Sequence, residues 1–325
     1  MRELRIGISG WTYPPWRGVF YPRDLVQKHE LAFASRQVNA IEINGSFYSL
    51  QTPASYARWR DATPPGFLFA IKAPRFITHL KRLRDIETPL ANFFASGLFA
   101  LREKIGPLLW QFPPNFAFDE KRFETFFQLL PRDTRAAAKL ARRHDAHVAG
   151  RALTRIDRNR PLHHVLEVRH PSFVSETYIA LLRRYDIGSV IADTAGRWPF
   201  MEDITSDTVY IRLHGDEELY VSGYTEKALC EWARKIRVWH RGGTPAHTRL
   251  IASRAARAPQ GRAVFVFFDN DVKVRAPHDA MQLAHKLGIA PKPVSKDPFP
   301  DVPEVPRVSW PPVSNKKRSG KKSTR

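Results

Sequence analysis

Short apolar runs alternate with segments of helical periodicity along most of the chain. Eight such runs, rich in Val, Ile, Leu and Phe, are LRIGIS (4–9), AIEI (40–43), FLFAI (67–71), PLLWQF (107–112), HHVLEV (163–168), GSVIA (188–192), TVYIRL (208–213) and AVFVFF (263–268). Polar residues seldom interrupt them, which is typical of strands buried on both faces of a parallel sheet. The pattern therefore predicts eight parallel strands.

Helical periodicity predicts helices between most of these strands, over 24–38, 53–62, 89–105, 175–185, 225–240 and 276–288. Several begin at Pro, Ser, Thr or Asp and the last ends at Gly288, as helix boundaries commonly do. The interval between the sixth and seventh strands, TAGRWPFMEDITSD, leaves little room for a full helix. The interval between the fourth and fifth strands has a surplus, Asp133 to Arg160, which predicts a basic helix and a loop on the outside.

Strand alternating with helix eight times predicts an α/β protein, a single (β/α)₈ TIM-type barrel with a basic insertion after the fourth strand. A doubly wound open sheet is the alternative. Against it, SGWTYPPW follows the first strand where a glycine-rich phosphate loop would be needed, so no nucleotide-cofactor motif is present. We expect a barrel domain over 1–290 and a Pro-rich, then basic tail over 291–325, its end disordered.

Net charge changes this picture only in two places. The 325-residue chain carries a net charge of +20, and residues 132–160 and 291–325 each have nine Arg or Lys against three acids, together 12 of the 20. One interpretation is a solvated face plus a basic tail, and the other is contact with nucleic acid through phosphate neutralisation. Both stay open.

Cys230 is the only cysteine, so neither an intrachain disulfide nor a thiolate metal cluster can form. No run approaches the length of a membrane-spanning helix, and the amino terminus shows no secretion signal. We therefore expect a cytoplasmic protein without membrane contact. The oligomeric state stays open.

The most informative feature is the polar residues at the carboxyl ends of the predicted strands, where barrels of this type carry their active sites. HHVLEVRHPSF (163–173) is the clearest case, since it delivers an acid and a base together. The candidate catalytic residues are Glu42, Glu167, His170, Asp193 and His214. The candidate substrate-binding residues are Trp11, Asn44, Lys72, Gln111, Arg169, Arg212, Asp269 and Asn270.

Alternation along a strand places residues two apart on the same side. On this basis four acids, Glu42, Glu167, Asp193 and Asp269, are predicted to meet Lys72, Arg169, Arg212 and His214 at one end of the barrel. The structural alternative is a buried ion-pair network, with Glu167 paired to Arg169 and Asp193 paired to Arg212.

Three chemistries remain open for this set. Glu42, Glu167, Asp193 and His214 have suitable identities for a divalent metal, although no metal-binding spacing is present. In a metal-free alternative, a carboxylate and a histidine transfer protons while the cations hold an anionic group. Lys72 as a Schiff-base lysine is the third. Aromatic residues of the loops could stack on a sugar or a base, or simply pack.

Seven segments resemble the YecE-like family, a domain of unknown function numbered 72. They are SGWTYPPWRGVFYP (9–22), EINGSFY (42–48), FAIKAPRFITHLKRL (69–83), LLWQFPPNF (108–116), EVRHPSF (167–173), YIRLHG (210–215) and FFDNDVKVRAPHDA (267–280). The resemblance runs from about Leu4 to Gly288 and implies a TIM-type barrel in a bacterial cytoplasmic protein, without a reaction. Asp269, where we expect Asn, and Phe173, where we expect Trp, depart from the family pattern.

The sequence thus predicts an uncharacterised enzyme, a hydrolase, isomerase or lyase that binds a small anionic or sugar-like substrate at the strand ends. The alternative is a nucleic-acid-associated binding module, or a phosphodiester hydrolase, that uses the basic insertion and tail.

Overall fold

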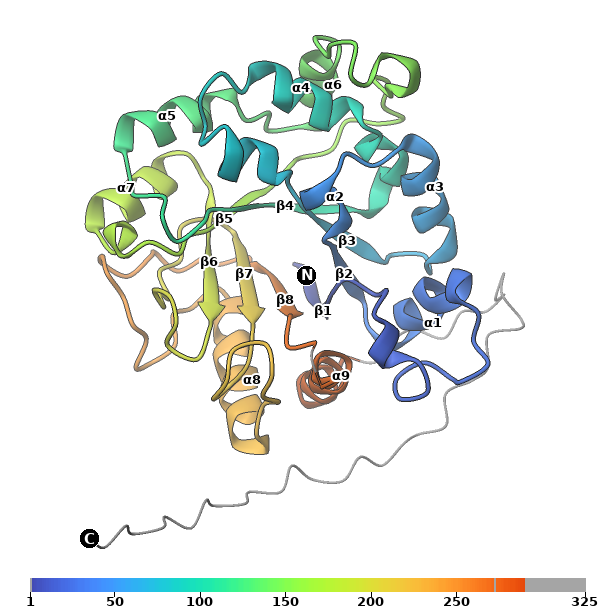
Figure 1. Ribbon diagram of the computed structural model, residues 1–325. Helices are drawn as coiled ribbons and strands as arrows, with labels where there is room; N and C mark the ends of the chain where they lie inside the picture. Colours follow the sequence, from blue (N-terminus) through green and yellow to red (C-terminus); the bar gives the residue numbers. More distant parts are fainter. Residues whose placement is uncertain (1, 272, 290–325) are drawn as a thin grey trace, which may run out of the picture.

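The computed structural model describes residues 2–271 and 273–289, and its centre is a closed barrel of eight parallel strands (Figure 1). The strands pair in sequence order, and β8 closes the barrel against β1. Their bounds are β1 Leu4–Ser9, β2 Ala40–Ile43, β3 Leu68–Lys72, β4 Ile105–Gln111, β5 His164–Glu167, β6 Gly188–Asp193, β7 Thr208–Leu213 and β8 Ala263–Phe268. The predicted (β/α)₈ barrel is confirmed and the doubly wound sheet is wrong. The predicted tail, 291–325, lies outside the described residues.

Helices surround the barrel (Figure 1). The α-helices are α1 Glu30–Gln37, α2 Gly45–Tyr48, α3 Pro53–Ala62, α4 Glu87–Ala95, α5 Glu120–Leu129, α6 Thr134–Ala141, α7 Glu176–Arg184, α8 Glu226–His240 and α9 Arg275–Leu287. Shorter turns of 3₁₀ helix are Pro14–Trp16, Gln27–His29, Leu98–Lys104, Ala149–Arg151 and Pro171–Phe173, and η3, Phe76–Leu80, is a π-helical turn. Side chains of Thr52, Asp119, Asp133, Ser175 and Thr225 accept backbone N–H groups at helix starts.

The single helix predicted over 89–105 is wrong. It divides into α4 and the 3₁₀ turn Leu98–Lys104 at Gly97, whose φ is 122°. A Cβ at Gly97 would lie 2.5 Å from the backbone nitrogen of Pro53, so α3 approaches too closely for any other residue. Close packing of two helices, which local periodicity does not encode, overrides the helical pattern here.

Side chains that point into the barrel form a small apolar layer beneath the polar strand ends. Its members are Ala40, Ala70, Leu109, Val165, Val190, Ala192, Tyr210, Phe265 and Phe267. Large rings of β8 face the small residues of β1, and a Cβ at Gly7 would lie 3.3 Å from the Phe267 ring and 1.9 Å from the Ala40 carbonyl oxygen. On each of these strands the next inward-pointing residue, at the carboxyl end, is polar. The apolar layer therefore lies directly beneath the candidate site and supports it.

No helix lies between β6 and β7 in the described chain, as the short interval predicts. The segment after α8 covers this side instead. Glu202 accepts the backbone N–H of Arg249, and Asp203 accepts those of Ile251 and Ala252. Two buried carboxylates therefore fasten a loop where the barrel lacks a helix.

Candidate functional site

Arg212 is the centre of a buried ion-pair cluster at the carboxyl ends of the strands. Its guanidinium is fully buried and donates to three carboxylates. Nε and Nη2 reach Oε2 and Oε1 of Glu42 at 3.1 and 2.9 Å, Nη1 reaches Oε2 of Glu167 at 2.6 Å, and Nη2 reaches Oδ2 of Asp269 at 2.9 Å. These residues and Arg169 are called the Arg212 cluster below.

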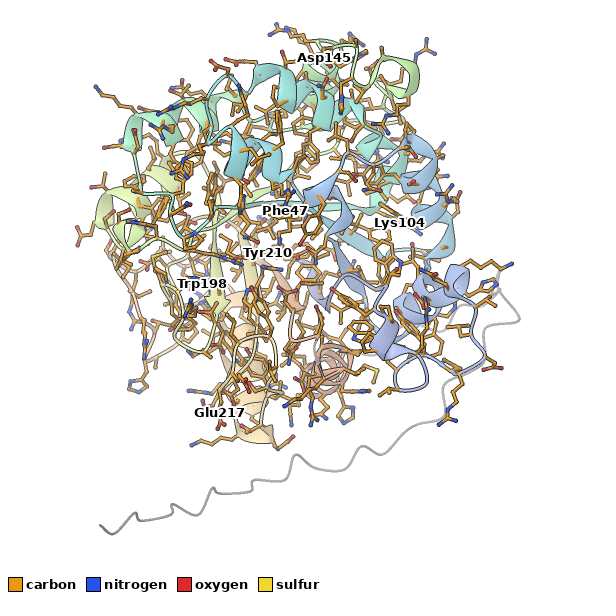
Figure 2. The ribbon with its side chains drawn as sticks, in the orientation of Figure 1. Phe47, Lys104, Asp145, Trp198, Tyr210 and Glu217 are labelled. Carbon is orange, nitrogen blue, oxygen red and sulfur yellow. The ribbon has the colours of Figure 1, made fainter. Side chains whose placement is uncertain are left out.

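Both carboxylate oxygens of Glu42 accept two hydrogen bonds each. Besides Arg212, the hydroxyl of Tyr210 donates to Oε2 at 2.6 Å and the hydroxyl of Ser9 donates to Oε1 at 3.1 Å. Tyr210 lies near the barrel axis in the view of Figure 2. A carboxylate that accepts four hydrogen bonds from buried donors has no lone pair left for a substrate or a metal.

Arg169 connects the cluster to the loops. It donates to Oε1 of Glu167 at 2.9 Å, and its guanidinium lies 3.7 Å from the centre of the Trp198 ring. Its Nη2 also donates to the Tyr220 hydroxyl at 3.4 Å. The predicted Glu167–Arg169 pair is confirmed, and the aromatic rings hold Arg169 over the strand ends by a cation–π contact.

Charge compensation keeps the cluster ionised. Burial alone would raise the pKa of Glu167, but the charges of Arg212 and Arg169 outweigh it and hold this pKa well below its usual range. The same balance between burial and Arg212 lowers the pKa of Asp269 to about 2. Glu167 and Asp269 therefore remain carboxylates at neutral pH.

Lys72 differs from the two arginines because it has no carboxylate partner in the described part of the chain. Its side chain is 92% buried at the end of β3, since only 8% is exposed, and its Nζ lies 4.5 Å from the centre of the Phe47 ring. Burial and the nearby charge of Arg212 lower its pKa to about 8, while the cluster carboxylates act in the opposite direction. Lys72 is thus a buried cation whose counter-charge is incomplete.

His214 follows Arg212 on the same side of β7 and is fully buried. Burial, then Arg212, lowers its pKa below the usual value, so the imidazole is neutral at neutral pH. Nδ1 lies 3.0 Å from Oδ2 of Asp269, although neither ring nitrogen has a well-directed hydrogen bond within the described chain. The rings of Trp198 and Tyr220 lie edge-on to it, with centroids at 6.5 and 5.3 Å, and cover it.

Asp271 supplies a second unusual carboxyl group beside Asp269. Burial and the charge of Asp269 raise its pKa to about 8, so it holds a proton at neutral pH. Its Oδ1 is buried and has no hydrogen-bond partner in the described chain. Two neighbouring carboxyl groups with pKa values driven apart are a common arrangement for a general acid and a fixed charge.

Gln111 and Asn44 also face this end of the barrel. Gln111 ends β4 on the inward side and is 5% exposed. Asn44 follows β2 on the side of Glu42, and its Oδ1 is buried without a hydrogen-bond partner among the described residues. The structure therefore brings these two predicted residues to the strand ends with spare polar atoms.

Asp193 does not join the cluster, so both its predicted position and its predicted pair with Arg212 are wrong. Val190 and Ala192 point into the barrel, and alternation turns Asp193 outward. It accepts a hydrogen bond from the Tyr224 hydroxyl at 3.2 Å and lines a separate cavity of about 430 Å³ against α8. Burial raises its pKa to about 6 there.

Three further predicted residues lie apart from the cluster, each for a local reason. His170 caps the turn Pro171–Phe173 through Ser172. Trp11 packs at 5.3 Å against Trp59 of α3, outside the strands. Asn270 donates to the Ser222 carbonyl and to Asp279 at 3.0 and 2.8 Å, which fastens the loop before α8. None of the three makes a hydrogen bond or an ion pair with the Arg212 cluster in the described chain, and their predicted roles remain predictions.

Sequence reasoning missed Tyr210 and His79. Tyr210 lies two residues before Arg212 on β7, so alternation alone could have found it. His79 lies on η3, where burial and then the charge of Lys72 lower its pKa to about 4. No sequence signal indicates a π-helical turn at this place.

The predicted metal set does not assemble. Glu42 is saturated by arginine, tyrosine and serine donors, Glu167 is paired with Arg212 and Arg169, and Asp193 faces outward. Within residues 2–271 and 273–289 no group of three His, Cys, Asp or Glu residues is placed to hold a metal ion. The donor set at the strand ends therefore does not fit a bound metal.

Fold and site together define a (β/α)₈-barrel protein with a buried arginine–carboxylate cluster at its strand ends. The chain belongs to the family described as "Protein of unknown function DUF72", whose model matches residues 5–304. This confirms the resemblance inferred from the seven sequence segments.

Curated relatives are bacterial. The Escherichia coli K12 protein named UPF0759 protein YecE is 24% identical over 282 residues, which cover 79% of this chain and 89% of that protein. The Bacillus subtilis UPF0759 protein YunF is 28% identical over 118 residues, covering 35% and 41%.

Solved structures of two DUF72 family proteins show the same fold. That of Thermotoga maritima aligns with a TM-score of 0.66 at 23% identity, covering 88% of this chain and 99% of the other. That of Enterococcus faecalis aligns with a TM-score of 0.64 at 15% identity, covering 90% and 98%. In the described part of this chain no helix has the length and apolar character to cross a membrane.

Proposed function

We propose that this protein is an enzyme that binds a small anionic or sugar-like substrate at the carboxyl ends of its strands and acts on it by proton transfer. The observation that carries the proposal is Lys72, a buried ammonium group with no carboxylate partner in the described chain. A buried charge without a partner is unfavourable unless a ligand completes it. The barrel could close without a buried, unpaired lysine at this position.

Electrostatics favour an anion at Lys72. Burial lowers its pKa only to about 8, so the ammonium form is still the major one at pH 7. Arg212 and Arg169 are committed to Glu42, Glu167 and Asp269. Among these three strand-end cations, Lys72 is the one without a carboxylate partner in the described residues, so it can neutralise a phosphate or carboxylate group.

Asp271 and His214 are the proton carriers of this proposal. Asp271 is protonated at neutral pH and has an unused buried oxygen, while His214 is neutral and has an unused Nε2. A neutral imidazole accepts a proton and a carboxylic acid donates one, which is the pairing that general acid–base catalysis requires. Because Trp198 and Tyr220 cover His214, we propose that their loops open when substrate enters.

This proposal changes the roles expected for two acids. Glu42 and Glu167 hold Arg212 and Arg169 in place and act as positioning residues rather than as acid, base or metal ligands. We also propose a cytoplasmic location, because Cys230 is an exposed free thiol, which a reducing compartment keeps unoxidised.

Inorganic phosphate is the probe for this proposal. We expect phosphate to raise the thermal unfolding midpoint of the wild type and to have no effect on Lys72→Met, which keeps the apolar stem over Phe47. Lys227→Met, a change at an exposed lysine of α8, is the matched control and should respond as the wild type does. Equal stabilisation of Lys72→Met and the wild type, or none of the wild type, would overturn the proposal.

A second candidate function is nucleic-acid binding outside the barrel, and one feature favours it. A surface hollow of about 770 Å³ lies between α6 and residues 154–159, and five of its side chains are basic: Arg135, Lys139, Arg142, Arg155 and Arg158. Its one carboxylate, Asp157, pairs with Arg160 at 2.7 Å. Such a surface neutralises phosphates without reading sequence.

The salt dependence of binding to duplex DNA tests this candidate. Replacement of Lys139 and Arg142 by Glu should weaken binding at every salt concentration and reduce its dependence on salt. Deletion of residues 291–325 should weaken binding uniformly across sequences if the tail contributes. Binding unaffected by either change would rule this function out.

A further inference from the structure

A large groove lies next to the candidate site, towards the periphery of the barrel. It has a volume of about 910 Å³ and lies between the start of α4, the segment that follows β3, and α2 with the residues after it. In Figure 2, Phe47 marks its inner end near the barrel axis and Asp145 its outer end at the edge of the molecule. The volume is that of a pocket for a ligand of drug-like size.

The groove gathers exposed apolar side chains. Tyr48, Phe76 and Leu80 are 68%, 49% and 64% exposed and all line it. They are three of the six large apolar residues that are exposed in the described chain. Isolated exposed apolar residues are ordinary, but half of them in one groove indicates a binding surface.

The segment that follows β3, which forms one wall of the groove, has an unusual backbone. Residues 76–80 form the π-helical turn η3. Three non-glycine residues after this turn have a positive φ: Arg82 at 50°, Leu83 at 64° and Asp85 at 48°. π-helical turns and left-handed residues are concentrated at functional sites, because only a function compensates for their strain. Neither feature is needed to connect β3 with α4.

Phe47 joins the groove to the candidate site. One face of its ring lies 4.5 Å from Lys72 Nζ, and the same residue lines the groove. The ring of Tyr48 lies beside it, at 5.1 Å between centroids. A ligand held by Lys72 can therefore extend over Phe47 and bring a second group to Tyr48.

The groove carries a small excess of positive charge, with Arg75, Lys81 and Arg151 against Asp85 and Asp145. Asp85 pairs with Lys81 at 3.7 Å, and Asp145 accepts from Asn92 and from the backbone of His147. Arg75 and Arg151 have no carboxylate partner within residues 2–271 and 273–289, and the guanidinium of Arg75 lies 5.6 Å from the centre of the Tyr48 ring. A planar ring and an anionic group are the two features that this combination recognises.

We propose that the groove binds the distal half of the substrate, and that the substrate is a planar aromatic compound with an anionic group, of the type of a nucleoside monophosphate. The phosphate lies at Lys72, the sugar over Phe47 and the base against Tyr48 and Arg75. This inference rests on the proposed function, since it extends the ligand bound at Lys72. It also unites the anionic and sugar-like substrates that the strand ends favour.

Calorimetric titration with AMP, ribose 5-phosphate and adenosine tests the inference in the full-length protein. AMP should bind at least about tenfold more tightly than ribose 5-phosphate, because stacking of the base contributes about that factor or more. Tyr48→Ala should remove this difference while leaving ribose 5-phosphate binding unchanged. Arg75→Gln should also weaken the binding of AMP. Val174→Ala, a change at an exposed apolar residue outside the groove, is the control.

The outcomes separate this inference from the proposed function. The groove inference fails and the proposed function stands if binding of ribose 5-phosphate requires Lys72 but AMP binds no more tightly than ribose 5-phosphate. The same conclusion follows if AMP binding is unchanged by Tyr48→Ala and Arg75→Gln. If AMP depends on Tyr48 and not on Lys72, the groove binds aromatic anions and the proposed function fails. Tyr48 is largely exposed, so Tyr48→Ala should fold, and circular dichroism verifies this.

Discussion

Arg212 and Glu42 form a two-point ion pair inside the barrel, with Nε on one carboxylate oxygen at 3.1 Å and Nη2 on the other at 2.9 Å. Both side chains are fully buried. They come from β7 and β2, which are separated by β8 and β1 around the barrel, so the pair bridges strands that do not touch each other (Figure 1). A fork-to-fork pair of this kind fixes both partners in orientation as well as in distance.

We expect Arg212→Met to be strongly destabilising. It would leave Glu42, Glu167 and Asp269 without their shared cation in a buried setting, and removal of one partner from a buried ion pair costs about 3–5 kcal/mol. Urea unfolding measures the loss. Arg184→Met is the matched control, because its pair with Glu124 is at the surface and is worth under about 1 kcal/mol. Equal effects of the two changes would contradict a central role for Arg212.

Glu167→Gln separates structure from catalysis. Gln keeps the shape but cannot neutralise Arg212 and Arg169, so we expect a loss of about 2–3 kcal/mol in unfolding free energy. Phosphate binding at Lys72 should persist, since Glu167 does not contact Lys72 through a hydrogen bond. Fluorimetric melting with and without phosphate measures both quantities. Unchanged stability with lost phosphate binding would instead make Glu167 a ligand-binding residue.

Sequence predicted the barrel well because its signal is local. Apolar runs and the residues that bound them identify β1 to β8. Alternation along the strands correctly places Glu42, Glu167 and Arg212 on the inner side of the barrel. Alternation applied consistently would also have excluded Asp193, which lies one position after inward-facing Ala192. The error came from reading every polar strand end as inward.

Other parts of the site were beyond local pattern. The raised pKa of Asp271 depends on its burial beside Asp269, and η3 depends on how the segment after β3 packs against α4. Charge alone also fails to distinguish Lys72 from Arg169, since Lys72 ends β3 and Arg169 lies two residues after the end of β5. Only the contacts show that one is paired with a carboxylate and the other is not.

Asp271 makes the stability of the protein fall as pH rises. Its pKa is about 8 in the folded protein and near 3.8 in the unfolded chain, so the folded state holds a proton that the unfolded state releases between these values. Its stabilising contribution is therefore present below pH 3.8 and lost as pH rises through 8. Asp271→Asn cannot titrate, so its stability relative to the wild type should increase across this window.

Denaturant unfolding at intervals between pH 4 and pH 9 measures this difference. Asp24→Asn, a change at an exposed carboxyl group, is the control and should run parallel to the wild type. A constant difference between Asp271→Asn and the wild type across the window would show that Asp271 is ionised in the folded protein, and it would remove this residue as the proton donor.

His164 should dominate the acid side of the stability profile. Its Nδ1 accepts the indole N–H of Trp110 at 3.0 Å and its Nε2 donates to the Pro131 carbonyl at 2.8 Å, so the bond from Trp110 requires the neutral ring. Burial lowers its pKa from 6.5 to about 3. The stabilising contribution is present above pH 6.5 and is lost as pH falls towards 3, because the unfolded chain takes up the proton first.

His164→Gln tests this contribution, since the amide can accept from Trp110 and donate to Pro131 but does not titrate. The variant should be less stable than the wild type at pH 7.5, because the amide fits the two partners less well than the ring. Its stability should then decline less steeply between pH 6.5 and pH 4. His285→Gln, at an exposed position of α9, is the comparison and should keep the wild-type slope. Parallel profiles for His164→Gln and the wild type would show that the acid sensitivity comes from other groups.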